Sequence, residues 1–248
     1  MLSRTGIIGD VHGNLAALEA VISCAECDSW LCVGDIVGYG PQPNECTGRV
    51  MELGALAVVG NHDLGSIDML SLAPFNQDAR RACEWTRRVL DQRARDFLGS
   101  LTGKLSDHDI LLVHASPRDP AWEYVLTETQ AYENLLEFEE HLCFNGHSHV
   151  PEVFSIGIGG EPDPDDIQSL TPDNGESVEI EAGRRYLANV GSIGQPRDGD
   201  PRACYVVLDS DRGLLSYHRV PYEVSRTQLA MREAGLPSFL IRRLSVGR

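Results

Sequence analysis

Five short apolar runs in the first 150 residues each lead into a turn that carries a polar side chain able to bind a metal ion. The runs cover residues 5–9, 29–33, 55–59, 109–113 and 142–145. Each is followed at once by Gly, Asn, Asp or His, which predicts a buried strand and a turn. Helical patterns separate several of the runs and favour an α/β sheet, whose ligands bind beyond the carboxyl ends of the strands.

The polar side chains at these strand ends comprise two carboxylates, one amide and four imidazoles. Alone, Asp10 reads equally well as a helix cap and Asn61 as a turn residue, but five successive strand ends make coincidence a poor explanation. The mixed oxygen and nitrogen set suits Mn, Fe, Zn, Co or Ni and is too rich in nitrogen for Mg or Ca. Seven ligands exceed one tetrahedral site and fit two ions that share a carboxylate. The predicted ligands are Asp10, His12, Asp35, Asn61, His114, His147 and His149.

The chain is strongly acidic, with a formal net charge of −16 over 248 residues. Non-specific nucleic-acid binding needs a basic surface, so we expect none. A phosphate-bearing substrate then needs a local attraction, which a bound metal provides. We expect a cytoplasmic protein without a membrane partner, because no apolar run reaches spanning length and the N-terminus lacks a signal pattern. The seven scattered cysteines are expected to be reduced thiols, mostly buried.

After residue 152 the pattern changes to consecutive strands with few helices between them, which predicts a second and more antiparallel sheet. No break in composition separates the two parts, so we expect one domain over residues 1–248. The strands are predicted at 153–158, 178–180, 186–190, 204–208 and 214–220. Helices are predicted at 15–21, near Pro43, at 76–101 with a break near Asp91, at 127–140 and over 223–244, and a mobile loop at 159–176.

In this order the motifs resemble the calcineurin-like metallophosphoesterases, and among them the small bacterial and archaeal phosphodiesterases. The resemblance is carried by Asp10-x-His12, Gly34-Asp35, Gly60-Asn61-His62-Asp63, His114 and Gly146-His147-Ser148-His149. It implies a four-layer αββα sandwich, in which helices flank two mixed sheets and the site lies at one edge. It also implies two divalent ions, with Mn²⁺ expected first. One ion would be held by Asp10, His12, Asp35 and His149, and the other by Asp35, Asn61, His114 and His147, with Asp35 bridging.

The resemblance implies a phosphoesterase, and we expect in-line attack of a metal-bridging hydroxide on a phosphodiester. His62 is the expected catalytic residue that protonates the leaving alkoxide, and Asn61 and His62 are expected to contact the substrate. Arg197, in a glycine-rich loop, is a further expected phosphate contact. Gly38 and Tyr39 stand where the phosphoprotein phosphatase branch has the acidic partner of its catalytic His and a phosphate-binding Arg. A phosphoprotein or diadenosine tetraphosphate substrate is therefore disfavoured.

Three alternatives stay open at this point. Two are also hydrolases, a phosphomonoesterase and a dinucleoside polyphosphate hydrolase. The third is a non-catalytic interaction scaffold on the same fold, which the intact ligand set and His62 disfavour. Asp63 is expected to cap or support rather than to bind metal. A homodimer through the C-terminal helices or a sheet edge is compatible with the sequence.

Overall fold

Two mixed six-stranded sheets form the centre of the molecule in the computed structural model, which describes residues 4–248. Across the first sheet the strands are β3 (Leu56–Ala57), β2 (Ser29–Cys32), β1 (Arg4–Ile8), β11 (Ala203–Asp209), β12 (Leu214–Val220) and β9 (Ser177–Glu179). Across the second they are β4 (Lys104–Asp107), β5 (Ile110–Val113), β6 (Leu142–Asn145), β10 (Arg184–Asn189), β7 (Glu152–Gly157) and β8 (Gln168–Leu170).

Each sheet joins parallel strands to antiparallel ones. In the first sheet β1 runs parallel to β2 and antiparallel to β11. In the second, β6 runs parallel to β5 and β10, whereas β7 is antiparallel to β10. The carboxyl ends of parallel neighbours share one sheet edge, so the turns after β1 and β2, and those after β5 and β6, are brought together in pairs.

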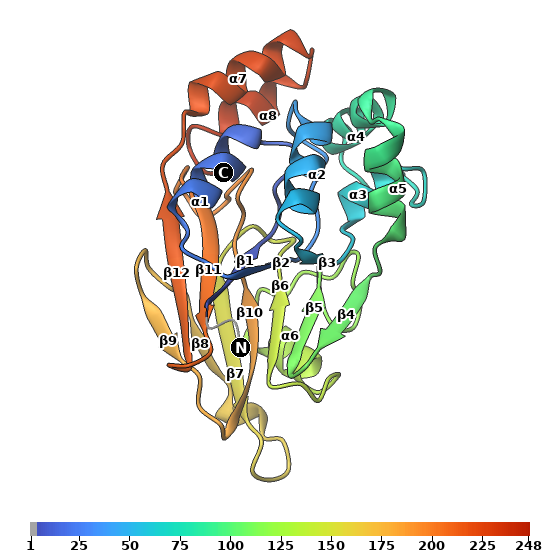
Figure 1. Ribbon diagram of the computed structural model, residues 1–248. Coiled ribbons are helices and arrows are strands. Elements are labelled where there is room, and N and C mark those ends of the chain that lie inside the picture. The colour runs from blue at the N-terminus through green and yellow to red at the C-terminus, as the bar shows by residue number, and fades with distance from the viewer. Residues whose placement is uncertain (1–3) are drawn as a thin grey trace.

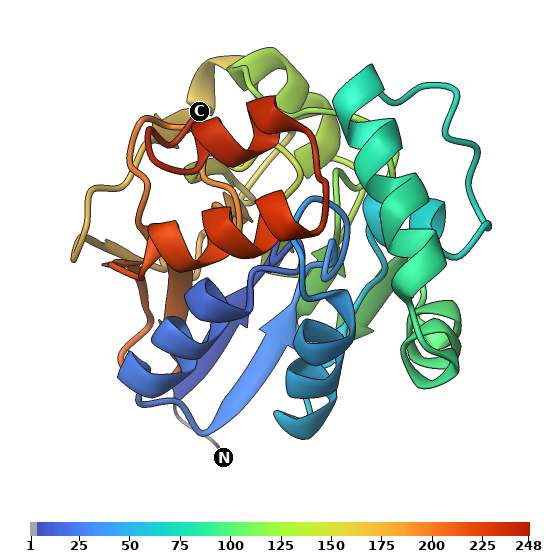
Figure 2. The same ribbon diagram turned by 90° about the horizontal axis from the view of Figure 1, so that it is seen from above.

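Eight α-helices and one 3-10 turn complete the described residues. They are α1 (Leu15–Cys24), α2 (Pro43–Glu52), α3 (Asn61–Ser66), α4 (Gln77–Val89), α5 (Gln92–Ser100), α6 (Glu128–Leu135), η1 (Pro164–Asp166), α7 (Val224–Glu233) and α8 (Ser238–Arg243). Figure 1 shows α3, α4, α7 and α8 gathered at the end of the sandwich to which β6 and β12 run. Seen from above, α7 and α8 lie beside α4 over the strand ends (Figure 2).

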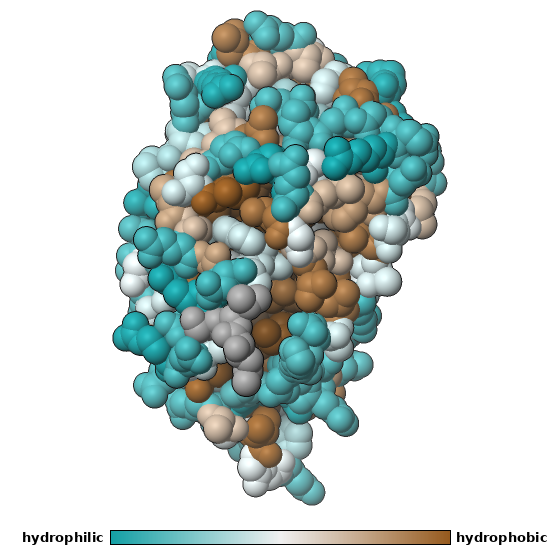
Figure 3. All heavy atoms as spheres, in the orientation of Figure 1, coloured by the Kyte–Doolittle hydropathy of each residue, from teal (hydrophilic) through white to brown (hydrophobic). Residues whose placement is uncertain are grey.

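Apolar side chains fill the spaces between the layers. Residues of α1 and α2 pack on the outer face of the first sheet. Inward-facing residues of both sheets, including Ile7, Val33, Phe144 and Val206, form the central layer. Residues of α6 cover the outer face of the second sheet. The predicted four-layer αββα arrangement is therefore confirmed. On the face drawn in Figure 3, hydrophilic residues surround apolar ones that gather across the middle.

Local signals explain most helix boundaries. The side chains of Asn14, Asn76, Asp91 and Thr127 each accept a hydrogen bond from a backbone N–H in the first turn of the helix that follows. Asp91 thus starts α5 directly after α4 ends, which confirms the predicted break in the segment 76–101. Within residues 4–248, every helix is too short or too polar to cross a bilayer.

Two sequence-based boundaries were wrong. The helix predicted over 127–140 ends at Leu135, because the acidic residues beyond it are unfavourable at the negative end of a helix. The predicted loop 159–176 contains η1 and β8, and β8 pairs with β7. Asp166 holds this segment in place, since it accepts a hydrogen bond from the Gly157 N–H and pairs with Arg184.

Candidate metal centre

Backbone strain is concentrated at the predicted ligands. Seven non-glycine residues among residues 4–248 have positive φ, and five of them are predicted ligands. Left-handed backbone at such residues costs of order 1–3 kcal/mol each and persists where the surroundings enforce it, which is common at functional sites. The five are Asp10 (φ 49°), His12 (49°), Asp35 (51°), His147 (66°) and His149 (62°).

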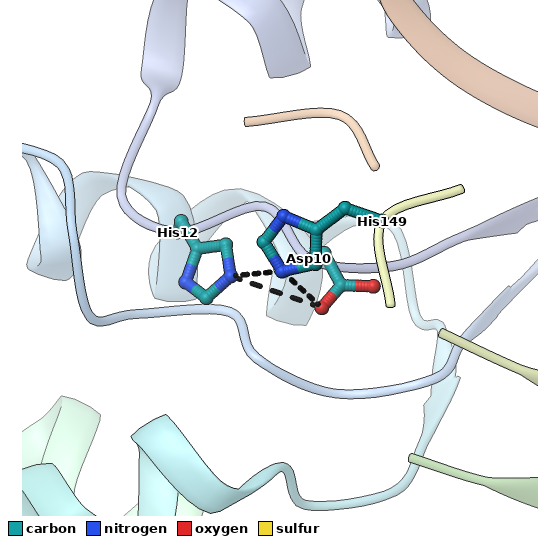
Figure 4. A group of neighbouring side chains, drawn as sticks. All are labelled: Asp10, His12 and His149. Carbon is teal, nitrogen blue, oxygen red and sulfur yellow. Dashed lines mark hydrogen bonds and ion pairs between the residues drawn. The ribbon is translucent and has the colours of Figure 1, made fainter. Parts of the chain in front are cut away.

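A first group of ligands joins the turn after β1 to the turn after β6. His12 Nε2 lies 3.0 Å from His149 Nε2, and His149 Nε2 lies 3.2 Å from Asp10 Oδ1. Figure 4 shows the two rings and the carboxylate pointing at one another. All three side chains are buried, and one donor atom from each lies within 4.8 Å of the others. This spacing is compatible with one ion bound by all three.

The hydrogen bonds of the two imidazoles determine which ring nitrogen directs a lone pair towards the centre of the group. His12 Nδ1 lies 3.1 Å from the Val37 carbonyl oxygen, and His149 Nδ1 lies 2.6 Å from that of Gln195. A carbonyl only accepts, so each Nδ1 donates and each neutral ring leaves a lone pair on Nε2. Burial lowers the pKa of both rings and keeps them neutral. Two lone pairs facing each other at 3.0 Å fit a cation between them.

A second group gathers around His114, which follows β5. His114 Nε2 lies 3.2 Å from both Asn61 Oδ1 and His147 Nδ1, and 3.4 Å from Asp35 Oδ2. His114 Nδ1 donates to the Val33 carbonyl oxygen at 2.9 Å, so Nε2 is the atom presented to the group. Burial is the largest single influence and would lower the pKa of His114, but the charge and hydrogen bond of Asp35, together with the Asp10 charge and the Val33 carbonyl, raise this pKa to about 9. Without metal, a proton on His114 therefore supplies positive charge here.

Asp35 belongs to both groups. Its Oδ1 accepts a hydrogen bond of 2.8 Å from the His62 N–H, which leaves Oδ2 to face inward. Asp35 Oδ2 lies 3.6 Å from His12 Nε2 and 3.4 Å from His114 Nε2. Asp10 is arranged alike, because its Oδ2 accepts from the His147 N–H at 3.0 Å. One oxygen of Asp35 is thus oriented towards both groups, as a bridging ligand requires.

The donor set fits a pair of divalent ions. Besides the facing lone pairs of the first group, Nδ1 of His147 and Nε2 of His114 face each other at 3.2 Å in the second. Carboxylate, amide and imidazole ligands match manganese, iron, zinc, cobalt or nickel. The structure brings all seven predicted ligands into these two groups. Their assignment to particular ions stays a prediction.

Neighbouring residues hold the ligand turns in place. Asp63 accepts hydrogen bonds from the N–H groups of Val37 and Gly60 at 2.9 and 3.0 Å, and so caps the turns rather than joining either group. A Cβ at Gly60 would lie 2.1 Å from Asp35 Oδ1, so only glycine permits this approach. The Ser192 hydroxyl donates to the Asp10 carbonyl oxygen at 2.9 Å.

His62 lies on α3 beside the ligands. Its ring centroid is 4.9 Å from that of His12 and 4.3 Å from that of Tyr39. Burial lowers the pKa of His62 to about 4, so the ring is neutral near pH 7. The Sγ atom of Cys83 lies 3.2 Å from His62 Nδ1, a contact that no motif in the sequence indicates.

Arg197 reaches the same region from the loop after β10. It donates from Nη2 to the Tyr39 hydroxyl at 3.3 Å and to Gln195 Oε1 at 3.2 Å. Its Nε is buried without a partner, and no carboxylate within residues 4–248 pairs with it. In a chain of net charge −16, an unpaired guanidinium beside the ligands is available for an anionic ligand.

Tyr124 was not predicted from the sequence. Its ring centroid lies 4.3 Å from that of His147, while 42% of the residue is exposed. It therefore covers one ligand and faces solvent. On another side, Met231 of α7 and Leu244 after α8 line a cavity of only about 10 Å³ with His12 and Tyr39. The C-terminal helices thus close that side of the centre.

Comparisons with known proteins agree with this geometry. The model of the calcineurin-like phosphoesterase superfamily domain matches residues 4–213. A metallophosphoesterase from Sphaerobacter thermophilus is 43% identical in sequence. Its crystal structure matches this one with a TM-score of 0.88, and the match covers 100% of both chains. An uncharacterised protein of Methanocaldococcus jannaschii is 34% identical over 254 residues, which covers 99% of each chain. A symmetrical bis(5'-nucleosyl)-tetraphosphatase of Psychromonas ingrahamii is 42% identical over 66 residues, 24% of each chain.

Proposed function

Since the chain belongs to the calcineurin-like phosphoesterase superfamily, we propose that it is a metal-dependent phosphoesterase whose preferred substrates are phosphodiesters. The observation that carries this proposal is the position of Asp35 Oδ2, within 3.6 Å of His12 Nε2 and 3.4 Å of His114 Nε2. One carboxylate oxygen that faces an imidazole of each group is suited to a pair of ions. We propose Mn²⁺ as the preferred metal.

The proposed roles divide between holding metal and handling substrate. Bound as a pair, divalent ions lower the pKa of water and polarise the oxygens of a phosphoryl group. The seven ligands hold the pair in the two groups described above. Asn61 and Arg197 orient the phosphate, Arg197 through its partnerless Nε. His62 assists the leaving oxygen: the neutral ring donates a hydrogen bond to it, and the ring transfers a proton only after taking up a second one, because loss of its single ring proton would leave an imidazolate.

A second candidate is hydrolysis of dinucleoside polyphosphates. The partial match to a symmetrical bis(5'-nucleosyl)-tetraphosphatase supports it, although that match covers only 66 residues. Gly38 and Tyr39 weigh against it, since they replace an acidic residue and an arginine of the related phosphatase motif. We therefore rank it second.

A substrate panel with the Mn²⁺-loaded protein tests the proposal. We expect faster turnover of bis-p-nitrophenyl phosphate than of p-nitrophenyl phosphate, and loss of both activities on chelation. Faster turnover of the monoester, or of diadenosine tetraphosphate, would replace the diester assignment with that substrate class. Absence of turnover with Mn, Fe, Zn, Co and Ni would favour the non-catalytic scaffold.

A further inference from the structure

The contact between Cys83 and His62 links α4 to the side chain proposed as proton donor. Cys83 Sγ lies 3.2 Å from His62 Nδ1, and Cys83 is completely buried. One turn further along α4, the Thr86 hydroxyl donates to the Gly38 carbonyl oxygen at 3.1 Å. The same face of α4 therefore contacts both His62 and the loop that follows Asp35.

The loop leaves no room for another partner at His62 Nδ1. A Cβ atom at Gly38 would lie 2.6 Å from His62 Nδ1 and 2.9 Å from His62 Cβ. Gly38 also has φ +132°, which side chains rarely adopt. An acidic residue at this position would displace the ring, so the polar contact comes from α4 instead.

The surroundings of the ring bear on the direction of this hydrogen bond. The rings of Tyr39, Phe75 and His12 pack around His62, and Nε2 makes no hydrogen bond within residues 4–248. Burial raises the pKa of the Cys83 thiol, so the sulfur keeps its hydrogen. A thiol is a weak donor and a weak acceptor, and a thiol that keeps its hydrogen can donate it to a ring nitrogen that carries a lone pair.

We propose that Cys83 is the positioning residue of His62, and that its thiol donates to Nδ1 and thereby keeps the ring hydrogen on Nε2. Nε2 then offers a hydrogen bond to the leaving oxygen in a fixed ring orientation. The role as positioning residue rests on the proposed function, but the hydrogen bond itself does not. Cys83 acts through His62 and contacts no ligand of the two groups.

The hydrogen bond is tested by ¹⁵N NMR of histidine-labelled protein loaded with diamagnetic Zn²⁺. The His62 signals are assigned from their loss in His62→Ala. We expect the hydrogen on Nε2 and a bare Nδ1 whose resonance shifts in Cys83→Ala but stays close to wild type in Cys83→Ser. A hydrogen found on Nδ1, or an Nδ1 resonance unchanged in Cys83→Ala, would overturn the proposal.

The positioning role is tested by the dependence of kcat on the leaving group. We expect Cys83→Ala to lower kcat by about 3- to 10-fold on phenyl esters, the rate equivalent of one neutral hydrogen bond, and far less on p-nitrophenyl esters. Cys83→Ser should restore most of the loss. Cys46→Ala, which removes another buried thiol from the α2 core, is the matched control and should leave both rates unchanged.

Equal losses on both leaving groups, or no rescue by Ser, would show that Cys83 only supports packing. If no phosphate ester is turned over at all, the proposed function and the positioning role fail together, while the NMR result still decides the hydrogen bond.

Discussion

Replacing Asp35 by Asn removes one charge from the centre with little change in shape. An amide oxygen can still accept the hydrogen bond that the His62 N–H donates to Oδ1 at 2.8 Å. The position of Oδ2, which faces His12 and His114, then holds a neutral group that bridges cations poorly. We expect the variant to bind fewer than two ions per chain. Turnover should fall by more than the roughly 10- to 100-fold that loss of an outer-shell partner costs.

The same substitution acts on His114 when no metal is present. Burial lowers the pKa of His114, and the Asp35 carboxylate is the main group that raises it to about 9. With that charge removed, we expect the pKa of His114 to fall by roughly 2–3 units, which corresponds to about 3 kcal/mol. The variant should therefore carry a neutral His114 at pH 7.5, unlike the wild type.

The free energy of unfolding of the metal-free protein should depend on pH through this pKa. The folded pKa of about 9 is above the value of about 6.5 for an unfolded histidine. The protonated His114 thus adds to the free energy of unfolding of the wild type. This contribution is complete below about pH 6.5 and is lost as the pH rises through about 9. In Asp35→Asn this decline should be absent.

Three measurements on both proteins suffice: an NMR titration of His114, urea unfolding across this pH range, and metal content after loading with Mn²⁺. If the pKa of His114 is the same in both proteins within about one unit, the electrostatic role given to Asp35 is wrong. Two ions per chain in the variant would refute its bridging role.

Three further predictions concern the metal, the proton donor and the anion contact. Removal of metal with EDTA should lower the melting temperature, because bound ions stabilise the folded state and lie between the Nε2 lone pairs of His12 and His149, which are 3.0 Å apart. A melting temperature that responds to neither EDTA nor Mn²⁺ would contradict this. His62→Ala should slow hydrolysis of esters with poor leaving groups by about 10²- to 10⁴-fold and that of p-nitrophenyl esters much less, and equal losses would exclude proton donation. Arg197→Met should raise KM about 10- to 100-fold, the cost of one hydrogen bond to a charged group, with a smaller change in kcat; an unchanged KM would place Arg197 outside the substrate site.

The sequence predicted the strands and the ligand turns because both depend on local patterns, whereas the four-layer sandwich was implied by the resemblance to the metallophosphoesterases. Short apolar runs such as 29–33 and 142–145 indicate buried strands, and a polar residue after each strand lies at the sheet edge by topology alone. The division of the ligands into two groups was implied by the same resemblance, and it requires the two sheets to pack together, because each group draws on turns of both sheets. The Asp91 break likewise depends on one capping side chain.

Other features depend on contacts between distant segments, which local patterns do not encode. Cys83 reads as one apolar position on α4, and only packing of α4 against α3 places its thiol beside His62. Tyr124 lies in an irregular segment without periodicity and reaches His147 through the tertiary fold. The strand β8 escaped prediction because its composition is that of a loop and its pairing with β7 relies on Asp166 and Arg184.

Asp35 is proposed to bridge two metal ions held by side chains from five turns. Anomalous diffraction at the manganese edge from Mn²⁺-loaded crystals tests it most directly. We predict two peaks about 3.5–4 Å apart with the Asp35 carboxylate between them. A single peak, or two peaks that do not share Asp35, would contradict it.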